Sequence, residues 1–369
     1  MCLDPNLTFL VSAYNVLLKV HSNHVKTIAM NGDRVSALMD YNIKDDRIVW
    51  FDPQKHKFIL KSIQSTVDMS DEIEVVGQPN SLLLDWVHDL LYWIDIKSKT
   101  IKVLHFKDTE SVYTVCDIKT ENPRDLVINV VKGVLVWSNI GFEANLMQTH
   151  LDGSNQSVLY DNNRQAFHLT VDYQTQRYYF IDFNDHSLYS IDFDGNNETF
   201  ILKSKELFDP IISIQVFNND LYFMTYFFIL RIPELDLQLN RAHVVYKIHR
   251  YPNYAYGEEF FMTNTIDIDR REFTSFKIMD PLLQPDVENV CQLSKCPQLC
   301  LPTSGQSYRC LLSDSMVHIK SDNNDINNNL IADNSQAIHY SMNTEKSVDR
   351  LSIVNTVFTA LLFIALIIK

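Results

Sequence analysis

Glycine and basic residues are both scarce in this chain of 369 residues. It contains eight glycines, and none of them forms the glycine-rich loop that holds nucleotide phosphates. Lysine and arginine number 32 against 46 aspartates and glutamates, which gives a net charge of −14. Proteins that bind nucleic acid present basic faces to the phosphate backbone. We therefore expect no nucleic-acid partner.

A basic leader and an obvious catalytic set are also missing. Asp4 precedes the first apolar stretch, which Ser12 and Asn15 interrupt, and no lysine or arginine comes before it. Secretory signals begin with basic residues, so we expect no signal peptide here. No Ser/His/Asp or Cys/His combination stands out. We expect a protein that is not an enzyme and has no catalytic residue, cofactor or metal site.

Long uncharged apolar runs are absent except at residues 351–368. As a helix this run would measure about 27 Å, close to the ~30 Å core of a bilayer. We predict a single membrane anchor that holds the rest of the chain on the extracellular or luminal side, at the cell surface or in endosomes. A buried C-terminal helix and a lipid-anchor signal with Ser341 as the attachment site are the alternatives. The asparagine-rich residues 313–350 are predicted to form a disordered stalk.

Aromatic residues are abundant, with 21 phenylalanines, 17 tyrosines and four tryptophans. They recur in five similar segments, namely IVWFD (48–52), LYWID (91–95), LVWSN (135–139), YYFID (178–182) and LYFMT (221–225). The second aromatic positions follow one another at intervals of 43 or 44 residues: Trp50, Trp93, Trp137, Phe180 and Phe223. A period of this length indicates a propeller blade or a pair of helices.

Strand-forming residues decide in favour of the blade. Each unit opens with a β-rich run such as LTVDY (169–173), enters the aromatic segment and continues with alternating apolar residues. It then turns at LDGSN (151–155) or FDGNN (193–197) before a last strand. Four strands per unit predict a blade. We expect a structural role for the blade motif, which comprises Trp50, Asp52, Tyr92, Trp93, Asp95, Trp137, Asn139, Phe180, Asp182, Tyr222 and Phe223.

A further blade is expected from the two ends of the chain. Residues 8–12 and 16–20 are strand-like and precede the first aromatic unit, and residues 275–278 form a lone strand-like run after the last. A blade that combines them would close the ring and leave no free sheet edge.

The repeats resemble a known family. LLLDWVHDLLYWIDIKSKTI and LTVDYQTQRYYFIDFNDHSLYSIDFDG are similar to successive YWTD repeats of the low-density lipoprotein receptor family. The resemblance covers about residues 7–287 and implies an all-β fold, a six-bladed propeller. Residues 288–312 resemble a degenerate EGF-like module, and residues 1–6 resemble the remnant of a preceding one. We expect the chain to be a fragment or a truncated member of this family.

Four cysteines lie in the EGF-like segment, and the resemblance implies disulfides between Cys291 and Cys300 and between Cys296 and Cys310. The third bridge is missing, because Leu312 stands where the next cysteine belongs. Spacing alone leaves three connectivities open, and a zinc site is the rival interpretation. No partner is predicted for Cys2 or Cys116.

Three Asn-X-Ser/Thr triplets are candidate glycosylation sites, at Asn6, Asn155 and Asn197. Asn155 and Asn197 follow the predicted turns between third and fourth strands, where we expect exposure. Together with the cysteine pattern, they favour an oxidising compartment.

The resemblance implies a membrane-anchored receptor portion that binds and releases a protein or lipoprotein ligand in receptor-mediated endocytosis. The alternative is a signalling co-receptor or matrix-binding propeller that binds proteins on its top face. Lys132 occupies the repeat position of His88, so the family's histidine-dependent release is not implied here. A remote alternative is a metal-dependent propeller hydrolase. It would need inward acids at the matching first-strand positions, which we assign to Asp40, Asp85, Asn129, Asp172 and Phe217.

Overall fold

The computed structural model describes residues 7–13, 16–21, 24–30, 37–64, 70–106, 108–120, 122–208, 211–226, 228–233, 243–248, 264–266, 273–303, 307–311 and 316–320. All of them lie in one compact unit, residues 1–330. The predicted anchor at 351–368 lies outside the described residues. Within the ranges given above, no helix combines the length and the apolar character that crossing a bilayer requires.

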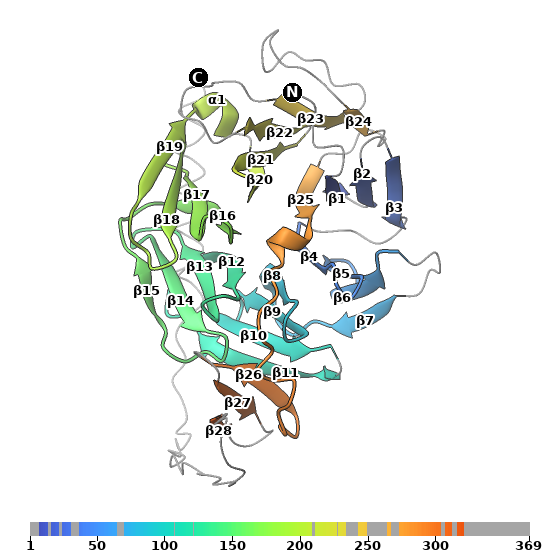
Figure 1. The fold of residues 1–369 in the computed structure, drawn as a ribbon, viewed down its shortest axis with the longest axis vertical. Helices are drawn as coiled ribbons and strands as arrows, with labels where there is room; N and C mark the ends of the chain where they lie inside the picture. The colour runs from blue at the N-terminus through green and yellow to red at the C-terminus, as the bar shows by residue number, and fades with distance from the viewer. Residues whose placement is uncertain are drawn as a thin grey trace, which may run out of the picture. The chain divides into compact units, whose positions relative to one another are not determined.

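Six sheets stand around a central axis as the blades of a propeller (Figure 1). The strands of blades 1 and 2, from the innermost outward, are β25 (Phe273–Met279), β1 (Thr8–Ala13), β2 (Val16–His21) and β3 (His24–Met30), then β4 (Met39–Asn42), β5 (Arg47–Asp52), β6 (Lys57–Ser62) and β7 (Asp71–Glu74). Those of blade 3 are β8 (Pro79–Asp85), β9 (Leu90–Asp95), β10 (Thr100–His105) and β11 (Asp108–Asp117). The predicted six-bladed fold is confirmed.

The remaining blades follow in chain order. The strands of blade 4, from the innermost outward, are β12 (Pro123–Asn129), β13 (Val134–Asn139), β14 (Asn145–His150) and β15 (Ser157–Tyr160). The strands of blade 5 are β16 (Ala166–Asp172), β17 (Arg177–Asp182), β18 (Ser187–Asp192) and β19 (Thr199–Lys203). After the short helix α1 (Lys205–Phe208), blade 6 contains β20 (Ile211–Phe217), β21 (Asp220–Thr225), β22 (Phe228–Ile232), β23 (His243–Ile248) and β24 (Asn264–Ile266). Its fifth strand, β24, pairs in parallel with β23.

Blade 1 joins the two ends of the propeller sequence, as predicted. β1 pairs with β25 in antiparallel register, with Thr8 opposite Met279. The Oγ atoms of Ser12 and Thr274 are 2.7 Å apart across the pair. Because Thr8 starts β1 and Met279 ends β25, the chain enters and leaves the propeller at the same end of this blade.

The periodic aromatic residues occupy the fourth position of the second strand in blades 2 to 6. Their side chains are at most 1% exposed, and each lies in a different one of six apolar clusters, which separate neighbouring blades. The rings of Trp93 and Phe58, for example, meet edge to face at 5.3 Å between blades 2 and 3. The equivalent residue of blade 1 is Val11, so this blade carries no aromatic signal in the sequence.

The two faces of the propeller differ in the turns that they carry. We call the lower face the one with the turns between first and second strands, such as 86–89 and 130–133. The upper face carries the turns between second and third strands, such as 96–99 and 183–186, and the links between blades. Thr8 and Met279 lie at the lower end of blade 1. Both connections of the propeller to the rest of the chain therefore leave from the lower side.

A small three-stranded sheet follows the propeller, with β26 (Leu299–Pro302), β27 (Ser307–Leu311) and β28 (Met316–Lys320). β28 lies within residues 313–350, which the sequence analysis assigned to a stalk. Its residues pair with β27 from Met316 opposite Leu311 to Lys320 opposite Ser307. An ordered strand thus occupies the start of that polar segment, and residues 321–350 lie outside the described ranges.

Candidate ligand-binding site

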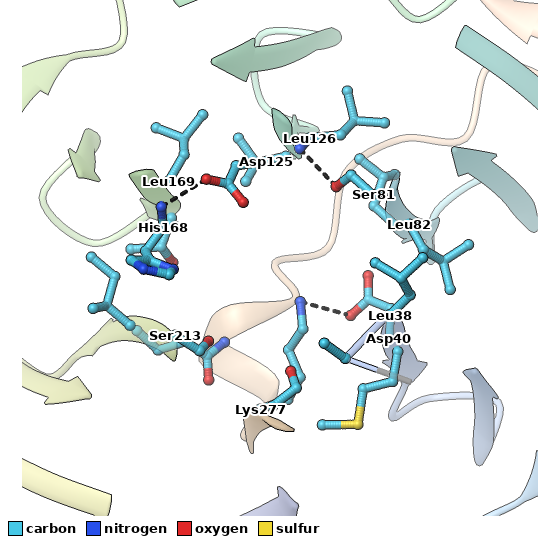
Figure 2. Close-up of a pocket in the computed structure, with 18 of the residues that line it drawn as sticks. Leu38, Asp40, Ser81, Leu82, Asp125, Leu126, His168, Leu169, Ser213 and Lys277 are labelled. Carbon is cyan, nitrogen blue, oxygen red and sulfur yellow. Dashed lines mark hydrogen bonds and ion pairs between the residues drawn. The ribbon is translucent and has the colours of Figure 1, made fainter. Parts of the chain in front are cut away.

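A pocket of about 350 Å³ lies between the innermost strands of the six blades. Figure 2 shows one polar side chain from each blade at this pocket: Asp40, Ser81, Asp125, His168, Ser213 and Lys277. They come from segments that are far apart in the sequence, and closing the ring brings them together. A concave site at the axis with convergent polar groups is the natural candidate for ligand contact.

The segment after β25 covers the lower end of the pocket. The 3-10 turn η2 (Pro281–Leu283) leads into Gln284, whose Nε2 donates to the Tyr41 carbonyl at 2.6 Å. The Ile43 amide donates to Oε1 of the same glutamine at 2.9 Å. Trp86 Nε1 donates to the Pro285 carbonyl at 3.2 Å. These bonds fix residues 280–285, which we call the linker, at the lower end of the pocket.

Polar side chains at the pocket connect neighbouring blades. Four of them accept an amide hydrogen from the innermost strand of the next blade, in the pairs Asp40 Oδ2 with Leu84 N (2.8 Å), Ser81 Oγ with Leu126 N (2.8 Å), Asp125 Oδ2 with His168 N (2.7 Å) and Gln215 Oε1 with Ile278 N. Inner-edge amides of a propeller have no strand partner, so these acceptors satisfy them. The pocket groups therefore hold the ring closed.

Two residues at the pocket have strained backbones. Asp125 and His168 have φ angles of 37° and 58°, in the left-handed region that non-glycine residues rarely adopt. Each sits where its strand departs from regular register, between Arg124 and Val127 and between Phe167 and Thr170. Burial lowers the pKa of His168, although the nearby Asp125 carboxylate opposes this. Bulges of this kind often re-aim side chains at binding sites.

The acid positions assigned to a hydrolase need a correction. The residues that end the first strands are Asn42, Asp85, Asn129, Asp172 and Phe217, so Asp40 was aligned two residues too early. Asp85 Oδ1 accepts from Val87 N at 2.9 Å, and Asn42 Oδ1 accepts from Lys44 N at 3.0 Å. These side chains cap lower turns. Within the described ranges, no group of three or more His, Cys, Asp or Glu could hold a metal ion.

His88 and Lys132 stand at equivalent positions of the lower turns but make different contacts. The Nδ1 atom of the buried His88 lies 2.7 Å from Asp85 Oδ2. Lys132 instead forms an ion pair with Asp194. The histidine of blade 3 is thus not repeated in blade 4.

The polar residues that end the blade motif close the upper turns. Asp52 Oδ1 accepts from Gln54 N at 2.8 Å, and Asp182 Oδ1 accepts from Asn184 N at 3.0 Å. Asp95 is more heavily bound: Oδ1 accepts from Gln78 N at 2.8 Å, and Oδ2 lies 2.9 Å from Lys102 Nζ. Burial opposes ionisation of Asp95, but these bonds prevail and hold its pKa well below the ordinary value.

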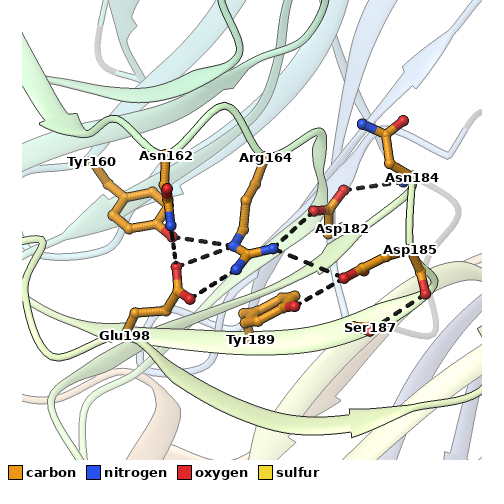
Figure 3. A network of polar contacts seen from close by, with 9 residues as sticks. All are labelled: Tyr160, Asn162, Arg164, Asp182, Asn184, Asp185, Ser187, Tyr189 and Glu198. Carbon is orange, nitrogen blue, oxygen red and sulfur yellow. Dashed lines mark hydrogen bonds and ion pairs between the residues drawn. The ribbon is translucent and has the colours of Figure 1, made fainter.

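A polar network around Arg164 joins blades 4 and 5 (Figure 3). Its Nη2 lies 2.8 Å from Glu198 Oε1, and its Nη1 lies 3.2 Å from Asp182 Oδ2. The guanidinium also covers the ring of Tyr189, with its carbon 3.6 Å from the ring centroid. The Nε atom donates to the hydroxyl of Tyr160 in blade 4 at 3.3 Å, so all three nitrogens have partners and the network serves blade packing.

The disulfide-bonded segment that resembles an EGF-like module, which we call the module, packs against the propeller. Disulfides join Cys291 to Cys300 and Cys296 to Cys310, the pairing implied by the resemblance, and leave no thiol of this set for zinc. Leu299, Leu301 and Leu311 share the apolar cluster between blades 3 and 4. Arg309 Nε lies 3.1 Å from Asp152 Oδ2, with side chains 14% and 0% exposed.

The remaining predicted positions are two exposed asparagines, one half-buried cysteine and two residues outside the described ranges. Asn155 and Asn197 are exposed, in the turns between third and fourth strands. Asn197 Nδ2 donates to Asp192 Oδ2 at 2.6 Å. Cys116 is a free thiol, and burial raises its pKa to about 12. Asn6 and Cys2 lie outside the described residues.

Sequence reasoning missed most of the pocket residues. Asp125 and His168, which are joined by a hydrogen bond, lie 43 residues apart and thus obey the same period as the aromatic motif. A search for polar residues repeated at this 43-residue interval could have identified both of them. The bulges hid them, because a shifted register breaks the alternation that marks inward residues.

No family model matches the chain. It is 21% identical over 328 residues to the vitellogenin receptor of Solenopsis invicta, covering 86% of this chain and 17% of that receptor. The low-density lipoprotein receptor-related protein 8 of Gallus gallus is 26% identical over 161 residues, 42% of this chain and 17% of the relative. The vitellogenin receptor Yl of Drosophila melanogaster is 20% identical over 300 residues, 80% of this chain and 14% of the relative.

Among solved structures, the nidogen/laminin complex contains a chain with a TM-score of 0.57 and 14% identity. The match covers 74% of this chain and 98% of the other, and it supports the fold alone. The chain spans 14–17% of the length of the receptors it matches. The fold, the repeats and these relatives agree: the chain carries a six-bladed YWTD-type propeller related to the low-density lipoprotein receptor family.

Proposed function

We propose that this chain is the ligand-binding propeller of an extracellular receptor and that it binds a protein or lipoprotein on its upper face. One observation carries the proposal. Thr8 and Met279 pair at the lower end of blade 1, and the linker and the module occupy the lower side. The upper face therefore has no covering segment among the described residues, while the pocket lies at its centre.

The relatives support a receptor role. Two of them are named vitellogenin receptors and one is a low-density lipoprotein receptor-related protein. We extend this to a role in receptor-mediated endocytosis, in which the propeller takes part in binding or release of the ligand. None of these names describes an enzyme, and the capped turns give the hydrolase alternative no support.

Glycosylation of Asn155 and Asn197 is part of the proposal. Both residues are exposed, and both have positive φ angles in tight turns, 59° and 52°. These turns lie at the far ends of the third strands from the upper turns, so glycans there would leave the upper face free. The two disulfides fit the same oxidising compartment.

Membrane attachment through residues 351–368 completes the proposal. The support is the uncharged run of bilayer length in the sequence. Expressing the full chain with and without a grafted signal peptide tests this topology. We expect glycan-dependent mass shifts at Asn155 and Asn197 only with the signal, and release from membranes when 351–369 is deleted. Retention of the deleted form on membranes would contradict the anchor.

A glycan placed on the upper face tests the ligand site. The single change Ile96→Asn creates an Asn-X-Ser triplet with Lys97 and Ser98 in an exposed upper turn. The full chain carrying this variant is cross-linked to proteins of the organism's extracellular fluid and compared with the unmodified chain by mass spectrometry. We expect partners that are lost in Ile96→Asn and kept in Asn155→Gln. Partners that resist the upper glycan would overturn the assignment of the face.

A further inference from the structure

A set of exposed cations and three phenylalanines crosses the upper face of blades 3, 4 and 5, where Phe142 and Phe183 are exposed and Phe167 is half-buried. We call it the cation–aromatic strip, and its residues are Lys97, Lys99, Lys119, Arg124, Phe142, Phe167 and Phe183. Phe142 is 97% exposed and Phe183 is 54% exposed, whereas the repeat aromatics of the same blades are buried. No other phenylalanine in the described ranges reaches the exposure of Phe142.

Contacts of the described backbone and rings make the strip continuous. The Ile118 amide donates to the Lys99 carbonyl at 2.7 Å, which places Lys119 beside the upper turn of blade 3. The Ile140 amide donates to the Asn122 carbonyl at 3.1 Å, which brings Phe142 close to the start of β12.

The strip continues from there into blade 5. The Arg124 guanidinium carbon is 5.6 Å from the centroid of the Phe167 ring. The Phe167 and Phe183 rings are 5.2 Å apart. The seven side chains thus follow one path across three neighbouring blades, past the edge of the pocket that Arg124 and Phe167 help to line.

The lysines of the strip differ from two buried or half-buried lysines of the propeller that form ion pairs. Lys57 pairs with Glu72 and Lys102 with Asp95, at 3.1 and 2.9 Å. The strip contains four cations: Lys97, Lys99, Lys119 and Arg124. No described carboxylate lies within 4 Å of the charged group of any of them.

Exposed carboxylates near the strip are fewer than its cations. Three are exposed in the adjoining described segments, Asp117, Glu143 and Asp161, against four cations, and Glu121 lies outside the described ranges. The chain as a whole has a net charge of −14. A local excess of cations on an acidic protein attracts and orients an acidic partner.

We propose that the strip binds an acidic polypeptide segment that also presents apolar side chains. This rests on the proposed function, in which the upper face binds the ligand. Carboxylates of the segment would face the lysines, and its apolar side chains would cover Phe142 and Phe183. Both kinds of contact are required, because cations alone would equally suit a sulfated glycan and exposed phenylalanines alone would suit any apolar surface.

Fluorescence anisotropy with a synthetic peptide tests the chemistry. The probe is a labelled peptide in which Leu-Phe is flanked by runs of aspartate and glutamate, and the control peptides carry lysine in place of the acids or serine in place of Leu-Phe. We expect the glycosylated full chain to bind only the first peptide, and more weakly as salt is raised.

Variants of the strip are compared with a lower-face control. Lys97→Glu with Lys99→Glu, and separately Phe142→Ser, should each weaken binding about tenfold or more, as loss of a central contact does. Val131→Ser, on a lower turn where Val131 is 54% exposed, should change it less than about twofold. Unchanged thermal melting would show that the variants are folded.

Three results would overturn the proposal. They are equal binding of the lysine-flanked peptide, equal loss in Val131→Ser, and binding to heparin that depends on the lysines but not on Phe142 while the acidic peptide fails to bind. If the peptide fails but partners sensitive to Ile96→Asn exist, the strip is wrong and the upper-face function stands. If no such partner exists either, both fall.

Discussion

The lower and upper faces of the propeller are built from turns of the same kind, yet their side chains have opposite surroundings. On the lower side, Trp86 donates to the linker, and Arg309 of the module meets the buried Asp152. On the upper side, Phe142 and Lys97 extend from their turns without a protein partner among the described residues. The lower face therefore packs against other parts of the chain, whereas the upper face is the one to which we assign the ligand, and mutations can test this division.

The largest effect is expected from Arg309→Met on the lower side. Removing this cation leaves Oδ2 of the Asp152 carboxylate, which is 0% exposed, without its charged partner, while Oδ1 still accepts from the Ser154 amide and hydroxyl. Losing one member of a buried pair costs about 3–5 kcal/mol. Urea denaturation with intact disulfides measures the change. Adding Asp152→Asn should recover part of the loss, and a loss below about 1 kcal/mol in the single variant would contradict the lower-side account.

Leu301→Ala tests whether the module is part of the propeller core. Leu301 is fully buried in the cluster that contains Trp137, so truncation should cost about 2–5 kcal/mol. Leu293→Ala is the matched control, because Leu293 belongs to the same module and is 91% exposed. It should change the free energy of unfolding by no more than about 0.5 kcal/mol. Similar values for both would show that the module does not pack as described.

Gly153→Ala tests a turn that touches the neighbouring blade. Gly153 has a φ of +84°, and a Cβ atom there would lie 2.0 Å from the Val115 carbonyl oxygen. We expect a loss of about 1–3 kcal/mol from this clash and strain. Gly141→Ala on the upper face also introduces strain, because its φ is +125°, but it lacks the clash, since the nearest atom would be Asn122 Nδ2 at 3.4 Å, and it should therefore cost less. The reverse order would contradict the comparison.

Asp95 predicts a dependence of stability on pH. Its pKa is lowered in the folded protein, where Gln78, Ser98 and Lys102 bind the carboxylate against the opposing effect of burial. The stabilisation that the Asp95 carboxylate gives to the folded protein is therefore complete above its unfolded pKa of about 4. It is lost as the pH falls toward the lower pKa of Asp95 in the folded protein. Between these limits we expect the wild type to lose about 1–2 kcal/mol more than Asp95→Asn in acid denaturation. If the free energies of unfolding of the two proteins fell in parallel with pH, the stabilising role of the Asp95 carboxylate would be refuted.

The smallest effect is expected from Phe142→Ser on the upper face. The side chain is 97% exposed, so its loss should alter the free energy of unfolding by no more than about 0.5 kcal/mol. Thermal or urea unfolding measures this independently of any ligand. A larger loss would mean that Phe142 has a structural contact, and the division between the two faces would then fail.

The sequence predicted the ring better than it predicted the pocket. Residues such as Trp93 and Trp137 fill equivalent gaps between blades, so packing imposes a period that is visible in the sequence. Blade 1 has Val11 at this position, and only the need to close the ring pointed to it. The outer strands of blade 6 were not predicted, because β23 and β24 lie in a segment without the repeat pattern.

The misassignment of Asp40 has a physical cause. Asp40 is followed by Tyr41, as Asp85 is by Trp86 and Asp172 by Tyr173, and this likeness set the wrong alignment. Asparagine caps a turn as well as aspartate does, and Asn42 takes the capping role in blade 2. The strand then ends two residues later, and Asp40 accepts a hydrogen bond from the Leu84 amide of the neighbouring blade. Geometry at the turn, rather than residue type, decided the position.

The closing of blade 1 has a consequence for biosynthesis. β1 is made near the start of the chain, but its partner β25 is about 260 residues further along, as the contact of Ser12 with Thr274 shows. At ~5–20 residues per second, the first strands wait on the order of 15 to 50 s for that partner. During this interval one edge of the nascent sheet is unpaired and open to wrong pairing. A ring that is locked by its own last strand is therefore exposed, for as long as it is being made, to pairing of that open edge with another chain.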